Sequence, residues 1–251
     1  MDKQALRERI WDELEDSGEA RFPFPPHGRI PNFAGADAAA ARLTDTDAWA
    51  AATVLKANPD APQLPVRRRA LHAGKRVYMA APRLAAAEPF LELDPDRIAP
   101  EDRDAAATLS HVDDYARRVG PDALPDVDLV VSGSVAVTES GGRVGKGEGY
   151  SDVEWAVLSE LGRVDETTPV ATTVHERQVV EDAPEPEPHD VSMDLVVTPE
   201  RVVETGATGK PAGIDWALAA DRLDEIPLLA RLAPEGVDTA DAADAADDAG
   251  G

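Results

Sequence analysis

The chain has 251 residues, of which 43% are hydrophobic, and its 49 acidic and 25 basic residues give a formal net charge of −24 at pH 7. This length is sufficient for one large α/β domain or two small ones, each with a real core. The acidic excess argues against nucleic acids and anionic membranes as partners, because binding phosphate groups requires basic surface. We therefore expect neither a nucleic-acid partner nor a membrane association.

The acidic composition also carries information about the solvent in which the protein works. Aromatic residues make up only 4% of the chain, and arginine outnumbers lysine among the basic residues. This balance resembles that of proteins from salt-loving archaea, where surface carboxylates keep proteins hydrated and molar cations screen their repulsion. The alternative is an ordinary acidic protein with an acidic tail. The halophilic interpretation predicts higher stability in molar salt.

The cysteine count and the N-terminal sequence indicate the cellular compartment. The chain contains no cysteine, which excludes disulfides, thiolate metal sites and a cysteine nucleophile. The N-terminus lacks the apolar stretch of a signal peptide, and no run of roughly 18 apolar residues is present. We expect a cytoplasmic protein.

Helical and strand periodicities alternate along the first 200 residues. They predict helices over residues 2–17, 36–52, 66–72, 102–118 and 152–161. They predict strands over residues 53–57, 76–80, 127–137, 169–174 and 193–198. This alternation predicts an α/β fold with a largely parallel sheet that is covered on both faces, with sites at the carboxyl ends of strands.

Two segments do not fit this alternation. Residues 22–33 are too rich in proline for a helix or a central strand, and we expect an ordered loop that buries its three phenylalanines. From residue 206 the pattern weakens, and only residues 216–232 have helical spacing. We therefore predict a main domain over 1–205, a helical extension over 206–235 and a disordered acidic tail over 236–251.

The glycine loop, residues 143–152, is the most informative motif. It alternates glycine with charged residues and leads from an apolar run into a helical pattern. Glycines allow backbone amides to approach an anion closely, Arg143 and Lys146 supply positive charge, and Asp152 is a candidate ligand for Mg²⁺. An ordinary strand-to-helix connection is the alternative. The loop lacks the spacing of a Walker A motif and of a dinucleotide-binding motif.

Other charged residues are candidates by position. Lys3 and Arg7 lie one helical turn apart and can reach a polyphosphate together, although they are also ordinary surface charges. Asp190 and Asp194 precede a strand, where a carboxylate caps a turn or binds a metal. His175 follows a strand, where it contacts substrate or caps the strand. The histidine spacing excludes a zinc site.

Taken together, these motifs resemble the 5-formyltetrahydrofolate cyclo-ligase family. The resemblance covers most of residues 1–203 and depends on Lys3 and Arg7, the glycine loop, and the later stretch His189 to Asp194. Within the family, the sequence is similar to the divergent branch of methenyltetrahydrofolate synthetase domain-containing proteins, through residues 28–36, 58–63 and 145–150.

The resemblance implies a three-layer α/β/α fold and an ATP- and Mg²⁺-dependent closure of 5-formyltetrahydrofolate to 5,10-methenyltetrahydrofolate. It implies that phosphates are bound by Lys3, Arg7, Arg143, Gly145, Lys146, Gly147 and Gly149. It further implies that Tyr150 borders the nucleotide or the pterin, and that Asp152 and Asp190 are the Mg²⁺ ligands.

Three positions depart from the family pattern and leave alternatives open. Glu148 stands where glycine or lysine is usual, Ser151 replaces a tyrosine, and only Asp60 and Gln63 lie where a glutamate contacts folate. A small-molecule folate derivative is the expected substrate. The alternatives are a non-catalytic nucleotide-binding regulatory module and an ATP-dependent ligase or kinase that acts on another small molecule.

Overall fold

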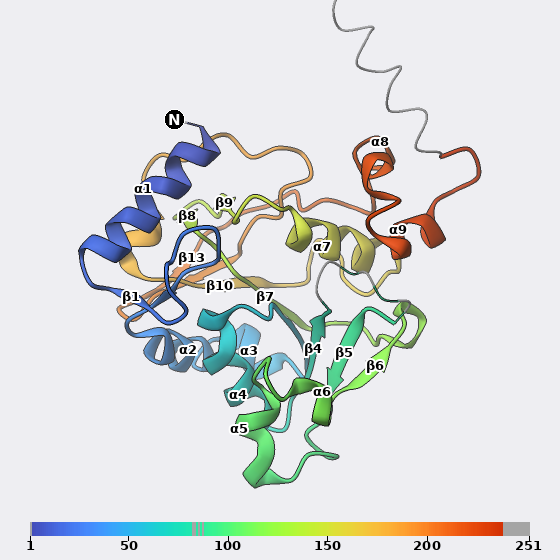
Figure 1. Ribbon diagram of the computed structural model, residues 1–251, viewed down its shortest axis with the longest axis horizontal. Coiled ribbons are helices and arrows are strands. Elements are labelled where there is room, and N and C mark those ends of the chain that lie inside the picture. Colours follow the sequence, from blue (N-terminus) through green and yellow to red (C-terminus); the bar gives the residue numbers. More distant parts are fainter. Residues whose placement is uncertain (1, 82–83, 85, 87, 238–251) are drawn as a thin grey trace, which may run out of the picture.

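The computed structural model describes residues 2–81, 84, 86 and 88–237 (Figure 1). Its centre is an eight-stranded sheet. In spatial order the strands are β13 (Val202–Glu204), β12 (Leu195–Val197), β10 (Val170–Thr173), β7 (Leu129–Ser132), β3 (Val54–Ala57), β4 (Arg76–Ala80), β5 (Phe90–Leu93) and β6 (Arg117–Val119). The predicted α/β class with a mainly parallel sheet is confirmed.

The five inner strands of this sheet, from β12 to β4, run parallel to one another, whereas β13, β5 and β6 pair antiparallel at the two edges. The chain builds β3 and β4 on one side and then returns to place β7, β10 and β12 on the other. The order of strands therefore reverses between β3 and β7, the position where open α/β sheets bind ligands beyond the carboxyl ends of their strands.

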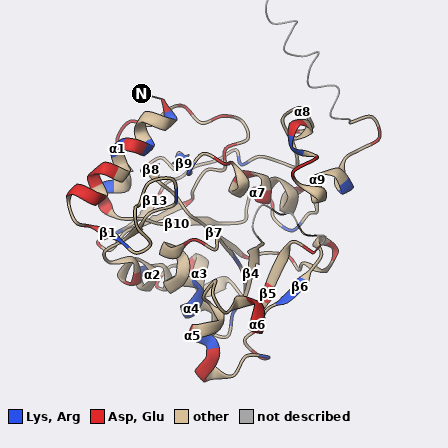
Figure 2. Ribbon diagram, in the orientation of Figure 1, with Lys and Arg blue, Asp and Glu red and all other residues tan. Residues whose placement is uncertain are grey.

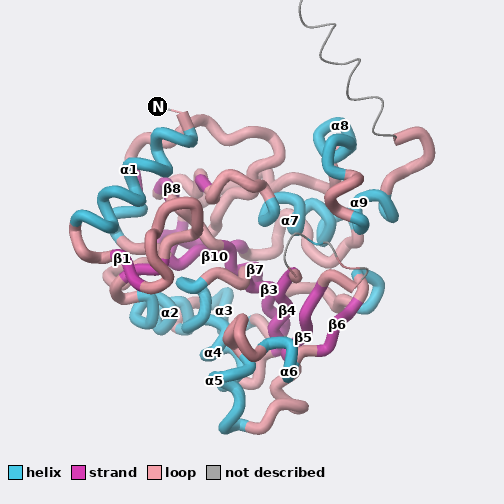
Figure 3. Tube along the Cα trace, in the orientation of Figure 1, coloured by secondary structure: helices cyan, strands magenta, loops and turns pink. Residues whose placement is uncertain are grey.

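Helices cover both faces of the sheet (Figures 1 and 3). One face carries α2 (Ala36–Thr44), α3 (Asp47–Ala51), α4 (Leu64–His72), α5 (Arg103–Ala106) and α6 (Val112–Tyr115). The other carries α7 (Tyr150–Glu160), α8 (Trp216–Ala219) and α9 (Pro227–Leu232). Along β7, Leu129 and Val131 pack in the first core and Val130 in the second, as the two-residue period of a strand requires.

Two small sheets lie beside the central one. The first pairs β1 (Ala20–Arg21) with β2 (Asn32–Phe33), and the second orders β11 (Val179–Val180), β8 (Ala136–Thr138) and β9 (Arg143–Val144). Helix α1 (Lys3–Asp16) begins where the side chain of Asp2 accepts a hydrogen bond from the Ala5 amide, and it buries Leu6, Ile10 and Leu14 in a core shared with β8 and β9.

Three predicted elements are divided in the structure. The helix predicted over 36–52 is two helices, because α2 ends at Thr44 and Thr46 then caps α3 by accepting a hydrogen bond from the Trp49 amide. The helix predicted over 102–118 is α5, α6 and the strand β6. The strand predicted over 127–137 is β7 and β8, which belong to different sheets. A continuous apolar run does not show where a chain leaves one sheet for another.

The turn between β7 and β8 needs glycine. A Cβ at Gly133 would lie 2.9 Å from the Ile30 side chain and 3.1 Å from the Asp60 carboxylate. The loop of residues 22–33 is ordered as predicted, but only Phe33 is buried, whereas Phe22 and Phe24 are 78% and 59% exposed. The prediction that all three phenylalanines pack was therefore wrong.

Acidic residues are spread over the helices, including α1 (Figure 2). Within the described residues, none of the helices has the length and apolar character that crossing a membrane requires. Of the tail predicted over 236–251, residues 238–251 lie outside the described part of the chain. The division into domain, extension and tail stays a prediction.

Candidate functional site

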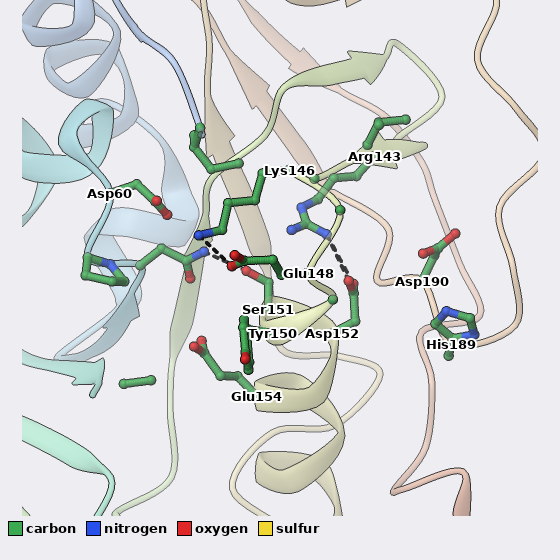
Figure 4. Close-up of a pocket in the computed structure, with 18 of the residues that line it drawn as sticks. Asp60, Arg143, Lys146, Glu148, Tyr150, Ser151, Asp152, Glu154, His189 and Asp190 are labelled. Atoms are coloured by element: carbon green, nitrogen blue, oxygen red, sulfur yellow. Dashed lines mark hydrogen bonds and ion pairs between the residues drawn. The ribbon is translucent and has the colours of Figure 1, made fainter. Parts of the chain in front are cut away.

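A cavity of about 570 Å³, here called the main cavity, lies at the carboxyl ends of β3 and β4. Its lining comes from α1, the loop after β3, the glycine loop, the start of α7 and the turn of residues 187–190. In Figure 4, Asp60 lies on one side of Lys146 and Ser151, and His189 and Asp190 lie on the other. Arg143, which lines the cavity, donates to the carbonyl of Gly133 directly after β7, so the cavity lies beside the position where the order of strands reverses.

All ten residues that the sequence selected line this one cavity. They are Lys3, Arg7, Arg143, Gly145, Lys146, Gly147, Gly149, Tyr150, Asp152 and Asp190. Two other candidates, Asp194 and His175, have structural roles instead. Asp194 accepts a hydrogen bond from the Val170 amide and pairs with Lys210, and the His175 side chain caps a short 3-10 helix at Glu176–Gln178.

The glycine loop presents the N-terminus of α7 to the main cavity. Gly149 precedes the helix with φ +66°, and no side chain of the described residues forms a capping hydrogen bond there. Gly147 has φ +109°, and a Cβ on it would lie 3.4 Å from the guanidinium carbon of Arg7. The first amides of an uncapped helix carry partial positive charge and form a favourable anion site.

Four cationic side chains surround this helix end. Lys3 Nζ lies 2.6 Å from Glu187 Oε2 and 2.8 Å from Asp190 Oδ2, and Lys146 Nζ lies 2.7 Å from Glu148 Oε2. Arg143 donates to both oxygens of Asp152, at 3.1 and 3.3 Å (Figure 4).

Arg7 is bound differently from the other three cations. Its Nε donates to the Gly145 carbonyl at 2.7 Å, and its Nη1 donates to Gln4 at 3.2 Å. Burial, together with the neighbouring Arg143 cation, lowers the pKa of Arg7 below its ordinary value. Burial also acts to lower the pKa of Lys3, but Asp190 and Glu187 outweigh it and the pKa of Lys3 is raised. An anion between Arg7 and Arg143 would relieve their mutual repulsion.

The acidic residues of the site offer oxygen ligands. Asp152 Oδ1 accepts a hydrogen bond from the Val191 amide at 3.2 Å, so it lies beside the turn that carries Asp190. Ligand atoms of Glu187, His189 and Asp190 lie within 4.8 Å of one another. Mg²⁺ prefers carboxylate oxygens and retains several waters. These side chains fit such an ion, with Glu187 as a candidate that the sequence missed.

A buried polar network, also missed in the sequence, lies beneath the glycine loop. Lys56 on β3 is 2% exposed and forms an ion pair with Glu154 on α7. Lys56 Nζ also donates to Asn58 Oδ1 at 2.5 Å, and Asn58 Nδ2 donates to Ser151 Oγ at 2.6 Å. The network ties the end of β3 to the first turns of α7. A lysine within a predicted buried strand was the signal that could have revealed it.

The loop after β3 is held from below by Arg67. This residue is 1% exposed and donates through Nη1 to the carbonyls of Asn58 and Asp60, at 2.6 and 3.1 Å. Burial lowers the pKa of Arg67 to about 10. Burial also raises the pKa of Asp60, even though Lys146 and Arg67 lie close enough to oppose the change. Asp60 is therefore a carboxylate kept at the cavity edge at an energetic cost.

The fold and this cavity define an α/β protein with a cavity lined by basic side chains beyond the carboxyl ends of its strands. The model of the 5-formyltetrahydrofolate cyclo-ligase family matches residues 1–199. The chain belongs to this family, as its motifs predicted.

Relatives extend the similarity beyond the residues that the family model matches. The methenyltetrahydrofolate synthase domain-containing protein of Mus musculus is 45% identical over 237 residues, covering 92% of this chain and 63% of its own length. The protein of the same name from Homo sapiens is 41% identical, with 92% and 61% covered. The chain thus spans somewhat less than two thirds of these relatives, and the match must include part of residues 206–235.

A solved structure is similar in fold. The 5,10-methenyltetrahydrofolate synthetase of Aquifex aeolicus superposes with a TM-score of 0.52 at 18% identity, covering 82% of this chain and 94% of its own. At this identity the match bears on the architecture alone, and it agrees with the mainly parallel sheet.

Proposed function

We propose that this protein is an ATP- and Mg²⁺-dependent cyclo-ligase that converts 5-formyltetrahydrofolate to 5,10-methenyltetrahydrofolate. Family membership supports a ligase acting on a folate. The observation that carries the nucleotide part is the convergence of four cations and an uncapped helix N-terminus on one cavity. Such a site stabilises phosphate groups by charge and by backbone amides.

The pairing of charges suggests how Mg·ATP would enter. Lys3, Arg143 and Lys146 each pair with a carboxylate. Phosphate oxygens would replace those carboxylates as partners of the cations, and Asp152 and Asp190 would then be released to hold Mg²⁺. The exchange conserves charge pairing, so neither set of charges needs to be left uncompensated in the cavity. The Mg²⁺ would neutralise negative charge between the phosphates during transfer.

The other end of the cavity would take the folate. Asp60 offers a carboxylate there, Asn58 and Ser151 add an amide and a hydroxyl, and the Glu154 carboxylate is already paired with Lys56. A pterin offers amino and ring N–H donors along one edge, which suit a carboxylate acceptor. This arrangement would place the reduced pterin between the β3 loop and the glycine loop, with its formyl group toward the phosphates.

The reaction then needs positioning and charge stabilisation. The formyl oxygen attacks the γ-phosphorus and the bond to the bridging oxygen breaks, which releases ADP. N10 attacks the activated formyl carbon, phosphate leaves with the former formyl oxygen, and N10 loses its proton. Arg7, Arg143 and Lys146 would stabilise the charge on the transferring phosphoryl group.

The test is formation of methenyl product, followed by absorbance, with 5-formyltetrahydrofolate, Mg·ATP and high KCl. Asp152→Asn should reduce kcat/KM by about 100-fold or more, as expected for losing a group that supports charge stabilisation. The exposed Asp45→Asn provides a matched control and should keep full activity. Absence of product with the wild-type protein, while ATP still raises its melting temperature, would favour a regulatory module or another substrate.

A further inference from the structure

The C-terminal segment, residues 206–235, is fastened to α7 and to the loop before β10. Lys210 is buried and its Nζ donates to the carbonyls of Glu166 and Thr168, at 3.0 and 3.1 Å. It also pairs with Asp194 at 2.8 Å. This anchor fixes the start of the segment against the central domain.

Three hydrogen bonds continue the attachment along α7. Trp155 Nε1 donates to the Pro211 carbonyl at 2.8 Å, the Gly213 amide donates to Ser159 Oγ at 3.0 Å, and the Ile214 amide donates to Glu160 Oε2 at 3.1 Å. Gly213 has φ +75°, and a Cβ there would lie 2.6 Å from Glu160 Oε2. The segment therefore follows the helix at close range through a position that only glycine fits.

Between this segment and α7 lies a second cavity of about 370 Å³. Its apolar lining comes from Val153 and Ala156 of α7 and from Ile214, Leu218 and Leu229 of the C-terminal segment. Both its size and its apolar character suit part of a small organic ligand.

The second cavity shares Gly149, Asp152 and His189 with the main cavity. Of these, Asp152 and His189 lie on the side of the cavity away from Asp60 (Figure 4). A nucleotide whose phosphates follow the glycine loop has its γ-phosphate toward the β3 end, where the second substrate would lie. The base and ribose of the nucleotide then point toward the residues that the two cavities share.

Arg222, which lines the second cavity, contacts Tyr150 at the end of the glycine loop. Its guanidinium carbon lies 4.6 Å from the centroid of the Tyr150 ring, and its Nε lies 3.6 Å from Glu225 Oε2. The Tyr150 hydroxyl donates to Glu225. The C-terminal segment thereby sets the position of the first residue of α7.

We infer that the second cavity takes the purine base and ribose of the nucleotide whose phosphates bind the glycine loop. The inference rests on the proposed nucleotide binding and specifies where selectivity for the base resides. An uncharged aromatic base suits an apolar slot, and Arg222 at its wall supplies donors for the sugar oxygens. One side of this cavity, with Ile214, Leu218 and Arg222, belongs to residues beyond the 1–199 stretch that matches the family model. The C-terminal segment therefore supplies part of the base-recognition site, and α7 supplies the rest.

The experiment compares Mg·ATP with Mg·tripolyphosphate by titration calorimetry. The wild-type protein should bind ATP at least about tenfold more tightly, a difference of about 1.4 kcal/mol. Ala156→Phe fills the second cavity and should remove this tenfold preference, while the affinity for tripolyphosphate stays within about twofold. Ala230→Phe, the same change at an exposed position of α9, should alter neither affinity.

The outcomes are distinguishable. Equal affinity of the wild-type protein for ATP and tripolyphosphate would overturn the inference and leave the proposed phosphate site standing. An Ala156→Phe variant that keeps its preference for ATP would also overturn the inference. A variant that loses affinity for 5-formyltetrahydrofolate and not for ATP would overturn it as well. A wild-type protein that binds neither phosphate compound would defeat the proposed function and the inference together.

Discussion

The two ends of the main cavity hold their charges in different ways. At the phosphate end, Lys146 and Glu148 form a pair whose side chains are 35% and 48% exposed, although the Arg143 and Asp152 side chains are only 6% and 12% exposed. At the β3 end, Lys56 and Glu154 form a pair whose side chains are only 2% and 8% exposed. Exposed pairs exchange partners at little cost, whereas a buried pair is expensive to separate. The Lys146–Glu148 pair is suited to exchanging partners with a ligand, and the Lys56–Glu154 pair is suited to keeping its geometry.

The largest expected effect comes from breaking the buried pair. Lys56→Met would leave Glu154 charged and unpaired beneath the glycine loop, and we expect it to lower the free energy of unfolding by about 3–5 kcal/mol. Urea unfolding followed by circular dichroism measures this. The matched change at the phosphate end, Lys146→Met, should cost less than about 1 kcal/mol. Equal losses for the two variants would contradict the comparison.

A smaller effect is expected at Arg7, and it should appear in binding. Arg7→Ala removes a cation close to Arg143, so the affinity for Mg·ATP should fall about 10- to 100-fold, the range for losing hydrogen bonds to a charged group. Calorimetric titration measures the change. Arg9→Ala, which alters an exposed arginine of the same helix, is the control and should bind as the wild type does. Similar losses in both variants would indicate a nonspecific effect of surface charge.

The smallest expected effect is a gain in stability at Asp60. Burial raises its pKa, so the folded state disfavours the ionised carboxylate. The cost is fully present above the raised folded-state pKa and disappears as the pH falls below the ordinary value of 3.8, where both states are protonated. Asp60→Asn should therefore raise the melting temperature slightly at pH 7 and make no difference near pH 3.

The melting curves at the two pH values test this sign directly, with the exposed Asp45→Asn as control. Asp60→Asn should also weaken binding of 5-formyltetrahydrofolate, because a carboxylate that costs stability is typically retained for function. An Asp60→Asn variant that is less stable than the wild type at pH 7 would show that the Asp60 carboxylate stabilises the fold. That result would contradict the view that Asp60 is retained at a cost in stability.

The sequence was sufficient to select most of the residues that line the glycine-loop end of the main cavity. Helix α1 and the glycine loop have strong local signals, a one-turn pair of cations and alternating glycines, and the family resemblance connected them. Their residues line one cavity. Local periodicity was less informative where the chain changes sheets after β7, and where α5, α6 and β6 follow one another in short pieces.

What the sequence determined by itself is the class of fold and the membership of a family, because hydrophobic periods and short motifs are local properties. What only the tertiary structure decided is which distant residues meet. The pairing of Lys56 with Glu154 joins residues 98 positions apart through the packing of α7 on β3. The second cavity likewise exists only because residues 211–229 fold back onto α7. Such contacts depend on the free energy of packing the whole chain, which no local pattern encodes.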